Sequence, residues 1–302
     1  MNDAYQFKSG FVAVMGRPNV GKSTLVNALL GQKIAAVSPR PQTTRKHQLG
    51  ILTLQNAQIV FVDTPGVHRP RHKLGERMNE EAQDALEHCE LVLFLVDASE
   101  LPTDEDRLVA SRITSLHLAV KTMLVLNKID LLPAKSAQEL TEAQAVFHAL
   151  LPQAEVFAIS ATRGDNREAL LTAMLERLPE GAPFYPEEQV TDMFERDIAG
   201  ELIREAALLI LREEIPHGIA VRVDEFTERG ETGAYIHATV IVERESHKPI
   251  VIGQGGSMLK LIGSVARKEI ETMSGRKVFL ELRVKVRKNW RDDEQAVRQL
   301  VG

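Results

Sequence analysis

A phosphate-binding loop near the start of the chain restricts the possible folds more than any other feature of the sequence. The residues Gly16-Arg17-Pro18-Asn19-Val20-Gly21-Lys22-Ser23 match the pattern GxxxxGK[ST] and lie between an apolar run and an amphipathic stretch. In a strand–loop–helix unit of this kind, backbone N–H groups and the helix N-terminus surround a phosphate, the lysine bridges the β- and γ-phosphates, and the serine hydroxyl binds Mg²⁺. We therefore predict a nucleotide site whose contacts in this segment are Gly16, Asn19, Val20, Gly21, Lys22, Ser23 and Thr24.

Short apolar runs alternate with amphipathic stretches from residue 10 to residue 180. The expected strands are Gly10–Met15, Gln58–Val62, Leu91–Val96, Thr122–Leu126 and Val156–Ile159. The expected helices are Lys22–Leu30, Leu74–His88, Asp104–Leu116, Ser136–Leu150 and Asn166–Leu178. Such alternation is typical of an α/β domain with a parallel sheet, and continuous apolar strands suit burial on both faces. We predict this domain over residues 1–180.

Two further segments are expected to complete a phosphate and magnesium site. The segment Asp63-Thr64-Pro65-Gly66 follows an expected strand, where the Asp63 carboxylate can reach Mg²⁺ and the Gly66 N–H can sense the γ-phosphate. The polar loop Pro39–Arg45 contains Thr44, our first choice for a further Mg²⁺ ligand, and Thr43, the second. The predicted magnesium ligands are therefore Ser23, Thr44 and Asp63, and the residues predicted to act in catalysis include Lys22, Thr44 and Gly66.

A third motif predicts which base the site selects. The segment Asn127-Lys128-Ile129-Asp130 follows another expected strand, and its aspartate can accept hydrogen bonds from N1–H and the exocyclic amine of guanine. Adenine would leave that carboxylate unpaired, a mismatch that discriminates by ~10⁴ or more. We expect Asn127 to support the loop, Lys128 to cover the base and Ser160-Ala161 to offer an N–H to guanine O6. The predicted ligands are GTP and GDP.

The residue after Gly66 bears on the rate of hydrolysis. Many Ras-like GTPases have a glutamine there, which orients the attacking water. This chain has Val67, whose side chain can neither donate nor accept a hydrogen bond. We therefore expect slow hydrolysis in the absence of a partner.

The strand–helix alternation stops at a segment rich in proline, which we interpret as a linker over residues 181–192. A second domain, residues 193–302, follows with a different order of elements. Its expected helices and strands are the helix Arg196–Arg212, the strands Gly218–Glu225 and Ala234–Glu243, a glycine-rich turn and helix over Gly253–Ser274, and the strand Val278–Val286. This order is that of the α+β type II KH fold.

A basic segment and a glycine-rich loop in this second domain predict RNA binding. Residues 246–291 contain 11 Lys and Arg against 3 Asp and Glu, although the whole chain has a net charge of −5. A GxxG loop lets a nucleic-acid backbone approach closely while bases lie over an apolar groove. The predicted RNA-binding residues are Lys248, Ile252, Gly253, Gln254, Gly255, Gly256, Lys260, Arg267 and Lys268. Trp290 is open to two interpretations, a side chain that stacks on a base or a core side chain.

The segments GRPNVGKST, PQTTR, DTPG, NKID, SA and VIGQGG occur in one order, and over essentially its whole length the chain resembles the Era family of bacterial GTPases. The resemblance implies a P-loop, Ras-like GTPase domain followed by a type II KH domain. It implies GTP hydrolysis coupled to binding near the 3′ end of small-subunit ribosomal RNA during assembly of the small ribosomal subunit. It also implies a cytoplasmic protein with peripheral contact at the inner face of the membrane, and K⁺ held by Asn19 as a further catalytic group. A lysine is frequent in the family where this chain has Gln254 and Gly255.

Two alternatives remain open from the sequence alone. One is a KH protein that binds RNA and uses GTP as a signal with little turnover; the other is a GTPase whose partner is a protein.

The apolar runs of the chain argue against a membrane-spanning protein. The longest, Leu91–Val96, has six residues, where a membrane span needs ~20. We expect a soluble monomer without a transmembrane segment.

Overall fold

The chain separates into two compact units, with the main boundary between Asp192 and Met193. The computed structural model describes residues 7–38, 44–66, 72–118, 121–132, 137–213, 215–230 and 232–301. Among the described helices, none is both long and apolar enough to cross a membrane. The limits predicted for the domains, 1–180 and 193–302, remain predictions.

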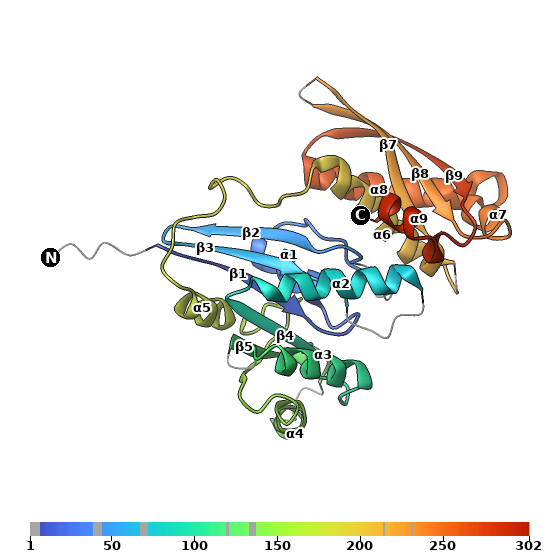
Figure 1. Ribbon diagram of the computed structural model, residues 1–302. Helices are drawn as coiled ribbons and strands as arrows, with labels where there is room; N and C mark the ends of the chain where they lie inside the picture. Colours follow the sequence, from blue (N-terminus) through green and yellow to red (C-terminus); the bar gives the residue numbers. More distant parts are fainter. Residues whose placement is uncertain are drawn as a thin grey trace. The chain divides into compact units, whose positions relative to one another are not determined.

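The first unit is built on a six-stranded sheet in the order β2-β3-β1-β4-β5-β6 (Figure 1). Its strands are β1 (Lys8–Met15), β2 (Gln48–Leu54), β3 (Ala57–Asp63), β4 (Leu91–Asp97), β5 (Thr122–Asn127) and β6 (Glu155–Ala158). Strand β2 is antiparallel to β3 and every other pairing is parallel. The predicted α/β class is confirmed.

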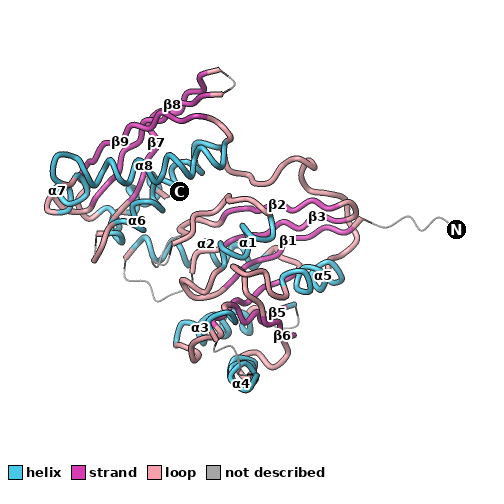
Figure 2. Tube along the Cα trace, turned by 180° about the vertical axis from the view of Figure 1, so that it is seen from behind, coloured by secondary structure: helices cyan, strands magenta, loops and turns pink. Residues whose placement is uncertain are grey.

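Helices cover both faces of this sheet. They are α1 (Lys22–Leu30), α2 (Lys73–Glu87), α3 (Asp104–Ser115), α4 (Ala137–His148) and α5 (Arg167–Arg177). Ala82 of α2 and Ile113 of α3 share one buried cluster with Phe94 of β4, while α1 and α5 lie on the other face (Figure 2). Burial on both faces explains why β4 is apolar along almost its entire length.

The segment that we interpret as a linker is held along the sheet of the first unit by hydrogen bonds. The buried side chain of Gln58 accepts from the backbone N–H groups of Phe184 and Tyr185 and donates to the carbonyl of Tyr185. Further along, the N–H of Ile51 donates to the carbonyl of Val190 at 2.8 Å. We call this segment, residues 181–192, the strap.

The second unit has a three-stranded sheet in the order β7-β8-β9. Its elements are α6 (Glu195–Ile210), β7 (Ala220–Arg229), β8 (Gly233–Val242), α7 (His247–Ile252), α8 (Ser257–Ser274), β9 (Lys277–Val286) and α9 (Glu294–Leu300). Strands β7 and β8 are antiparallel, and β8 and β9 are parallel. The order of elements is the predicted one, with two short helices, α7 and α9, that the sequence did not predict.

The core of the second unit lies between its sheet and the helices α6 and α8. Ile203 of α6 and Ile262 of α8 pack with Ile236 of β8, and all three are fully buried. Trp290 is also fully buried, and its indole N–H donates to the carbonyl of Gly218 at 2.9 Å. Trp290 therefore cannot stack on a base, and of its two interpretations the core one is correct.

Candidate functional site

The predicted nucleotide-binding residues gather at the carboxyl ends of parallel strands in the first unit. They follow β1, β3, β5 and β6, which is the edge where open α/β sheets bind ligands. The described residues placed there are Gly16, Asn19, Val20, Gly21, Lys22, Ser23, Thr24, Asp63, Thr64, Pro65, Gly66, Asn127, Lys128, Asp130, Ser160 and Ala161. Of the remaining predicted groups, Thr43 and Val67 lie outside the described residues.

The phosphate-binding loop has the backbone that its glycines permit. Gly21 has a φ of 101°, and a Cβ atom there would come within 2.3 Å of the Asn127 side-chain nitrogen. A side chain at this position would therefore push the two loops apart. Helix α1 begins at the next residue, and its N-cap residue, Gly21, has no side chain that could cap the first turn. The N–H groups of this turn point to an anion site, since helix N-termini favour negative charge.

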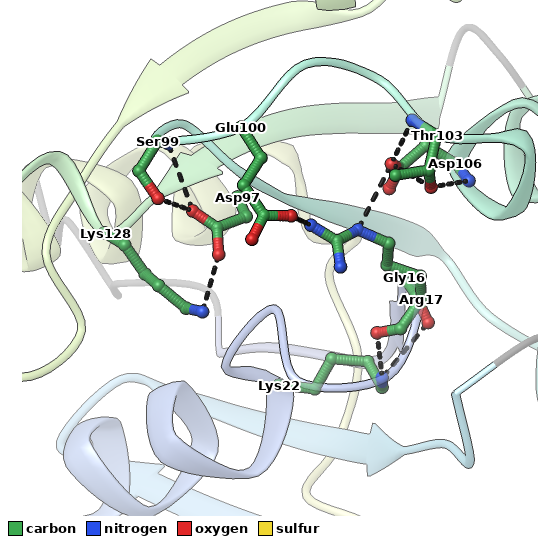
Figure 3. A network of polar contacts seen from close by, with 9 residues as sticks. All are labelled: Gly16, Arg17, Lys22, Asp97, Ser99, Glu100, Thr103, Asp106 and Lys128. Carbon is green, nitrogen blue, oxygen red and sulfur yellow. Dashed lines mark hydrogen bonds and ion pairs between the residues drawn. The ribbon is translucent and has the colours of Figure 1, made fainter. Parts of the chain in front are cut away.

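Lys22 is buried beside the same loop (Figure 3). Its ammonium group donates to the carbonyl oxygens of Gly16 at 3.1 Å and Arg17 at 3.0 Å. Burial lowers the pKa of Lys22 to about 8, although the nearby Asp63 carboxylate raises it. A buried cation with a flexible stem, close to a helix N-terminus, is suited to bind phosphate oxygens.

The three predicted magnesium ligands lie together. The Ser23 hydroxyl donates to Asp63 Oδ2 at 2.6 Å and lies 2.9 Å from the Thr44 hydroxyl, which is 3.3 Å from the same carboxylate oxygen. Burial raises the pKa of Asp63, and its Oδ1 atom is buried without a hydrogen-bond partner among the described residues. A buried carboxylate oxygen that accepts no hydrogen bond from a described residue and lies beside two hydroxyls is suited to bind Mg²⁺, which prefers oxygen ligands.

Asn127 connects three of the predicted segments. Its amide nitrogen donates to the carbonyl of Val20 at 2.8 Å, and its amide oxygen accepts from the N–H of Ala161 at 2.9 Å. The Ser160 hydroxyl donates to Asp130 Oδ1 at 2.6 Å and so orients the carboxylate predicted to read guanine. The N–H of Ala161 is already engaged, so its predicted contact to guanine O6 would require a shared hydrogen bond.

Gly66 and Thr64 place the segment after β3 against the phosphate-binding loop. A Cβ atom on Gly66 would come within 2.7 Å of the Pro18 nitrogen, so the two backbones are in close contact. The Thr64 hydroxyl donates to the carbonyl of Val14 at 2.7 Å and is completely buried. Thr64 therefore fixes the segment to β1 through its side chain, a role that the motif alone did not indicate.

Three ionic contacts around this site were not predicted from the sequence. Arg17 pairs with Glu100 and, through its Nε atom at 3.2 Å, with Asp106 in the first turn of α3 (Figure 3). Lys128 pairs with Asp97 at 2.6 Å. The only signal for Asp97 was its position directly after a buried strand, where side chains of α/β proteins reach a ligand.

In the second unit, the GxxG loop forms an exposed turn between α7 and α8. Gly253 has a φ of 72° and a Cβ atom there would lie 2.7 Å from Met258, so the loop needs glycine at this point. Gly255 has a φ of 58° with no atom near its Cβ position, and Gln254 is exposed. Ile252, before the loop, packs on the core. The loop can therefore accept a ligand from solvent.

Ion pairs divide the basic segment into two sets. Five cations pair within the unit: Arg276 with Glu228, Lys277 with Glu271, Arg283 with Asp224, Arg287 with Asp293 and Arg291 with Glu243. In contrast, the four cations predicted to bind RNA, Lys248, Lys260, Arg267 and Lys268, form no ion pair with any described residue, and the last three are exposed on α8. We call these four the free cations. Lys285 and Lys288 are also exposed and form no ion pair with a described residue, so the charge available to a polyanion lies on α7 and α8 and near the end of β9.

Comparisons with known proteins agree with both parts of this description. Residues 11–128 match the family model described as 50S ribosome-binding GTPase, and residues 214–291 match the model described as KH domain. The protein named GTPase Era from Clostridium botulinum strain Langeland is 45% identical over 295 residues, which cover 97% of this chain and 98% of that protein.

Two solved structures are similar along the same length. One is Era in complex with MgGDPNP and nucleotides 1506–1542 of 16S ribosomal RNA, with a TM-score of 0.89, 40% identity and coverage of 97% of this chain and 98% of that one. The other is a single-residue variant of Aquifex aeolicus Era bound to GDP and AlF4⁻, with a TM-score of 0.91, 40% identity and coverage of 97% and 99%.

Proposed function

The chain belongs to the Era family of GTPases, and from this premise we propose that it is a GTP-driven switch that binds the 3′ end of 16S ribosomal RNA during assembly of the small ribosomal subunit. As a member of this family it binds and hydrolyses GTP. The observation that carries the proposal is the joint presence of a nucleotide site in one unit, where the described residues of every predicted motif converge, and of an exposed GxxG loop and the free cations in the other.

We assign the phosphate chemistry to the residues that converge after β1 and β3. Ser23, Thr44 and Asp63 would hold Mg²⁺, which would supply positive charge to the phosphate oxygens of the nucleotide. Lys22 exchanges the carbonyl oxygens that it now contacts for phosphate oxygens, and the Gly66 N–H reports the presence of the γ-phosphate. Together these groups orient the nucleotide and stabilise charge, which is the main task of the protein in phosphoryl transfer.

The proposed enzyme turns over slowly by itself and uses K⁺ as a second cation. Support for slow turnover comes from Val67, which supplies no polar group to orient water. Support for K⁺ comes from Asn19, an amide in the phosphate-binding loop with a φ of 66°, at the position that holds K⁺ in some relatives of the family. Positive φ is unusual for a residue other than glycine, and asparagine tolerates it best, together with aspartate.

We assign RNA binding to the GxxG loop and the free cations. Lys260, Arg267 and Lys268 lie on one side of α8, away from the core residues of that helix, so they can follow a phosphate backbone past the loop. The likeness to Era bound to nucleotides 1506–1542 supports the 3′ end of 16S RNA as the target. The cations already paired within the unit are expected to contribute less, because RNA would have to compete with a carboxylate for each of them.

Binding and turnover should be measured together to test the proposal. We expect an RNA with the 3′-terminal 16S sequence to bind more tightly than a scrambled RNA of equal length, and to accelerate GTP hydrolysis by the full chain. The affinity should fall with salt by roughly one unit of log–log slope per phosphate contact. Equal binding of the two RNAs, or binding that does not respond to salt, would contradict the RNA assignment and favour a protein partner.

Three further features of the proposal rest on the family resemblance. They are a monomeric state, a location in the cytoplasm and peripheral contact with the inner face of the membrane. Sedimentation of the purified chain tests the first. Flotation with liposomes that contain anionic lipid tests the contact with membranes, and recovery of the protein only in the bottom fraction would contradict it.

A further inference from the structure

The lysine of the guanine-binding segment is held by a partner that lies outside every motif. Lys128 follows β5 directly, has a left-handed backbone with a φ of 66°, and its ammonium group donates to Asp97 Oδ2 at 2.6 Å. About a third of its side chain is exposed. A lysine stem that is free in solution loses rotamer entropy when it is ordered, so a partner that orders it in advance favours ligand binding.

Asp97 is fixed more firmly than its partner. Its side chain is 4% exposed, and its Oδ1 atom accepts from both the N–H of Ser99 at 3.0 Å and the Ser99 hydroxyl at 2.6 Å. Burial raises the pKa of Asp97, but the hydrogen bonds from Lys128 and Ser99 outweigh it and keep the pKa below its usual range. The carboxylate is therefore charged at neutral pH and has one oxygen left for the ammonium group.

The register of the sheet brings these two residues together. Strands β4 and β5 are parallel neighbours in which Asp97 is paired with Asn127, and the N–H of Ala98 donates to the carbonyl of Asn127 at 2.9 Å. Lys128 is the next residue in the chain. A shift of one residue in this register would move the carboxylate to the other face of the sheet and away from the lysine.

We propose that Asp97 is a positioning residue for guanine nucleotides, which holds the Lys128 ammonium so that the lysine stem covers one face of the base. The carboxylate makes no contact with the nucleotide in this role. It acts before binding, by ordering the stem, and it does not read the edge of the base, which is the task of Asp130. Three consequences follow: Asp97 increases the affinity for GTP and GDP equally, leaves the choice of base unchanged and leaves turnover at saturating GTP unchanged.

A double-mutant cycle on the full chain tests the proposal. The variants are Asp97→Asn, which keeps the shape of the side chain, Lys128→Met, which keeps an unbranched stem without the charge, and the combination of both. Dissociation constants and off-rates of fluorescent GDP and GTP analogues are measured by stopped flow. We expect Asp97→Asn to weaken both nucleotides by about 3- to 10-fold, and to have less than about a 2-fold effect in the Lys128→Met background.

Two readouts distinguish positioning from a general loss of structure. The ratio of GTP to ITP affinity reports on Asp130, because inosine lacks the exocyclic amine, and it should be the same in wild type and Asp97→Asn. The kcat at saturating GTP should also be unchanged while KM rises. The variant Asp104→Asn, an exposed carboxylate at the start of α3, is the matched control and should not alter affinity.

The outcomes separate this proposal from the nucleotide site itself, on which it rests. Equal losses for Asp97→Asn with and without Lys128→Met, or a changed GTP to ITP ratio, would overturn the positioning role. If Asp97→Asn does not fold, Lys128→Arg tests the same contact, because it retains a charge for Asp97 and should bind GDP more tightly than Lys128→Met; equal affinities would overturn the proposal. Failure of the wild-type chain to bind GDP would instead refute the site.

Discussion

The side-chain amide of Asn127 donates to the backbone carbonyl of Val20, 107 residues earlier in the chain, at a distance of 2.8 Å. Through this bond the loop expected to read guanine supports the loop expected to bind phosphate, and neither can move without the other. The contact is buried, so a substitution at Asn127 would leave the Val20 carbonyl without a hydrogen-bond donor. The loss in the free energy of unfolding should then exceed what the hydrogen bond itself contributes.

Asn127→Asp should therefore destabilise the first unit and weaken GTP and GDP binding together. The substitution places a second oxygen opposite the Val20 carbonyl, at an expected cost of about 1–3 kcal/mol in the free energy of unfolding. Chemical denaturation and fluorescent GDP binding measure the two effects. Asn166→Asp is the control, since Asn166 also donates to a backbone carbonyl but is exposed, and a loss of equal size there would refute the explanation.

Asp130→Asn should change which base is preferred. The carboxylate is oriented by Ser160 and should pair with the amine and N1–H of guanine, whereas an amide can donate to the C2 carbonyl of xanthine. We expect GTP affinity to fall and xanthosine triphosphate to bind more tightly than to the wild type. Competition against fluorescent GDP measures this, and a wild-type chain that binds ATP as tightly as GTP would contradict the assignment.

Nucleotide binding should take up a proton at mildly alkaline pH. Burial lowers the pKa of Lys22 to about 8 from 10.5, and phosphate oxygens will favour the charged form and raise it again. GDP affinity should therefore decrease as the pH rises above 8. Isothermal titration without Mg²⁺, in two buffers of different ionisation enthalpy, should detect proton uptake at pH 8 and very little at pH 6.5.

The same pKa of Lys22 also affects the stability of the folded chain, and here the effect of raising the pH is favourable, in contrast to its effect on nucleotide affinity. Between pH 8 and 10.5 the unfolded chain binds more protons at Lys22 than the folded one does, so this group's contribution to the free energy of unfolding increases with pH. The cost of burying the charged ammonium is fully present below pH 8 and fades above it. Equal proton uptake at pH 6.5 and pH 8 would contradict both statements.

Gly255→Asp should reduce RNA affinity without affecting GTP hydrolysis in the absence of RNA. The position is open and exposed, so the change adds a negative charge where a phosphate must approach and adds little strain beyond the positive φ, which aspartate tolerates. We expect a loss of about tenfold or more, which corresponds to about 1.4 kcal/mol. Gly255→Asn has the same shape without the charge and should bind nearly as well as the wild type.

Gly253→Asp is a poorer test, because a Cβ atom at Gly253 would lie 2.7 Å from Met258 and the helix would have to shift.

Stimulation of GTP hydrolysis by RNA should be lost in Gly255→Asp at RNA concentrations that saturate the wild type. Equal stimulation of both would mean that the loop does not carry the trigger.

Hydrolysis should be faster in K⁺ than in Na⁺ at equal ionic strength. The amide oxygen of Asn19 is the group expected to hold the ion, so Asn19→Ala should remove the difference. Since Asn19 has a φ of 66°, Asn19→Gly is a second variant that removes the amide without backbone strain. Equal wild-type rates in the two salts would exclude a role for K⁺.

Much of the fold and of the nucleotide site could be predicted because the information is local. Each motif is a short segment directly after an apolar strand, and strands of a parallel sheet end at the same edge. For this reason Ser23, Thr44 and Asp63 could be grouped before their distances were known. The inward face of β9 follows from a similarly local rule, since alternation along a strand assigns its residues to two faces.

Other features depend on contacts between distant parts of the chain and were missed. Strand β2 was not predicted, although Gln55 and Asn56 form the turn of a hairpin with β3, because its second face is only half-buried and its apolar pattern is weak. The binding of the strap depends on the side chain of Gln58, the second residue of β3. No spacing rule connects these residues in advance.

The basic segment illustrates a further limit of the sequence. All of its 11 cations look equal in the sequence, yet five are neutralised by carboxylates of the same unit. The register of the strands decides which cations remain available. For example, it sets Arg283 opposite Thr239 and near Asp224. Net charge therefore predicted a polyanion partner, and only the fold could show which cations remain free for it.

Trp290 is the only tryptophan of the chain, and it is buried in the second unit with its indole N–H bonded to the Gly218 carbonyl. Its fluorescence therefore reports on that unit alone, and the first unit is silent at wavelengths that excite only tryptophan. A denaturation curve followed by this emission and one followed by release of a fluorescent nucleotide would record two different melting events in one sample. By the same reasoning, any change in tryptophan emission when GTP is added would be a signal transmitted from one unit to the other, visible without a label.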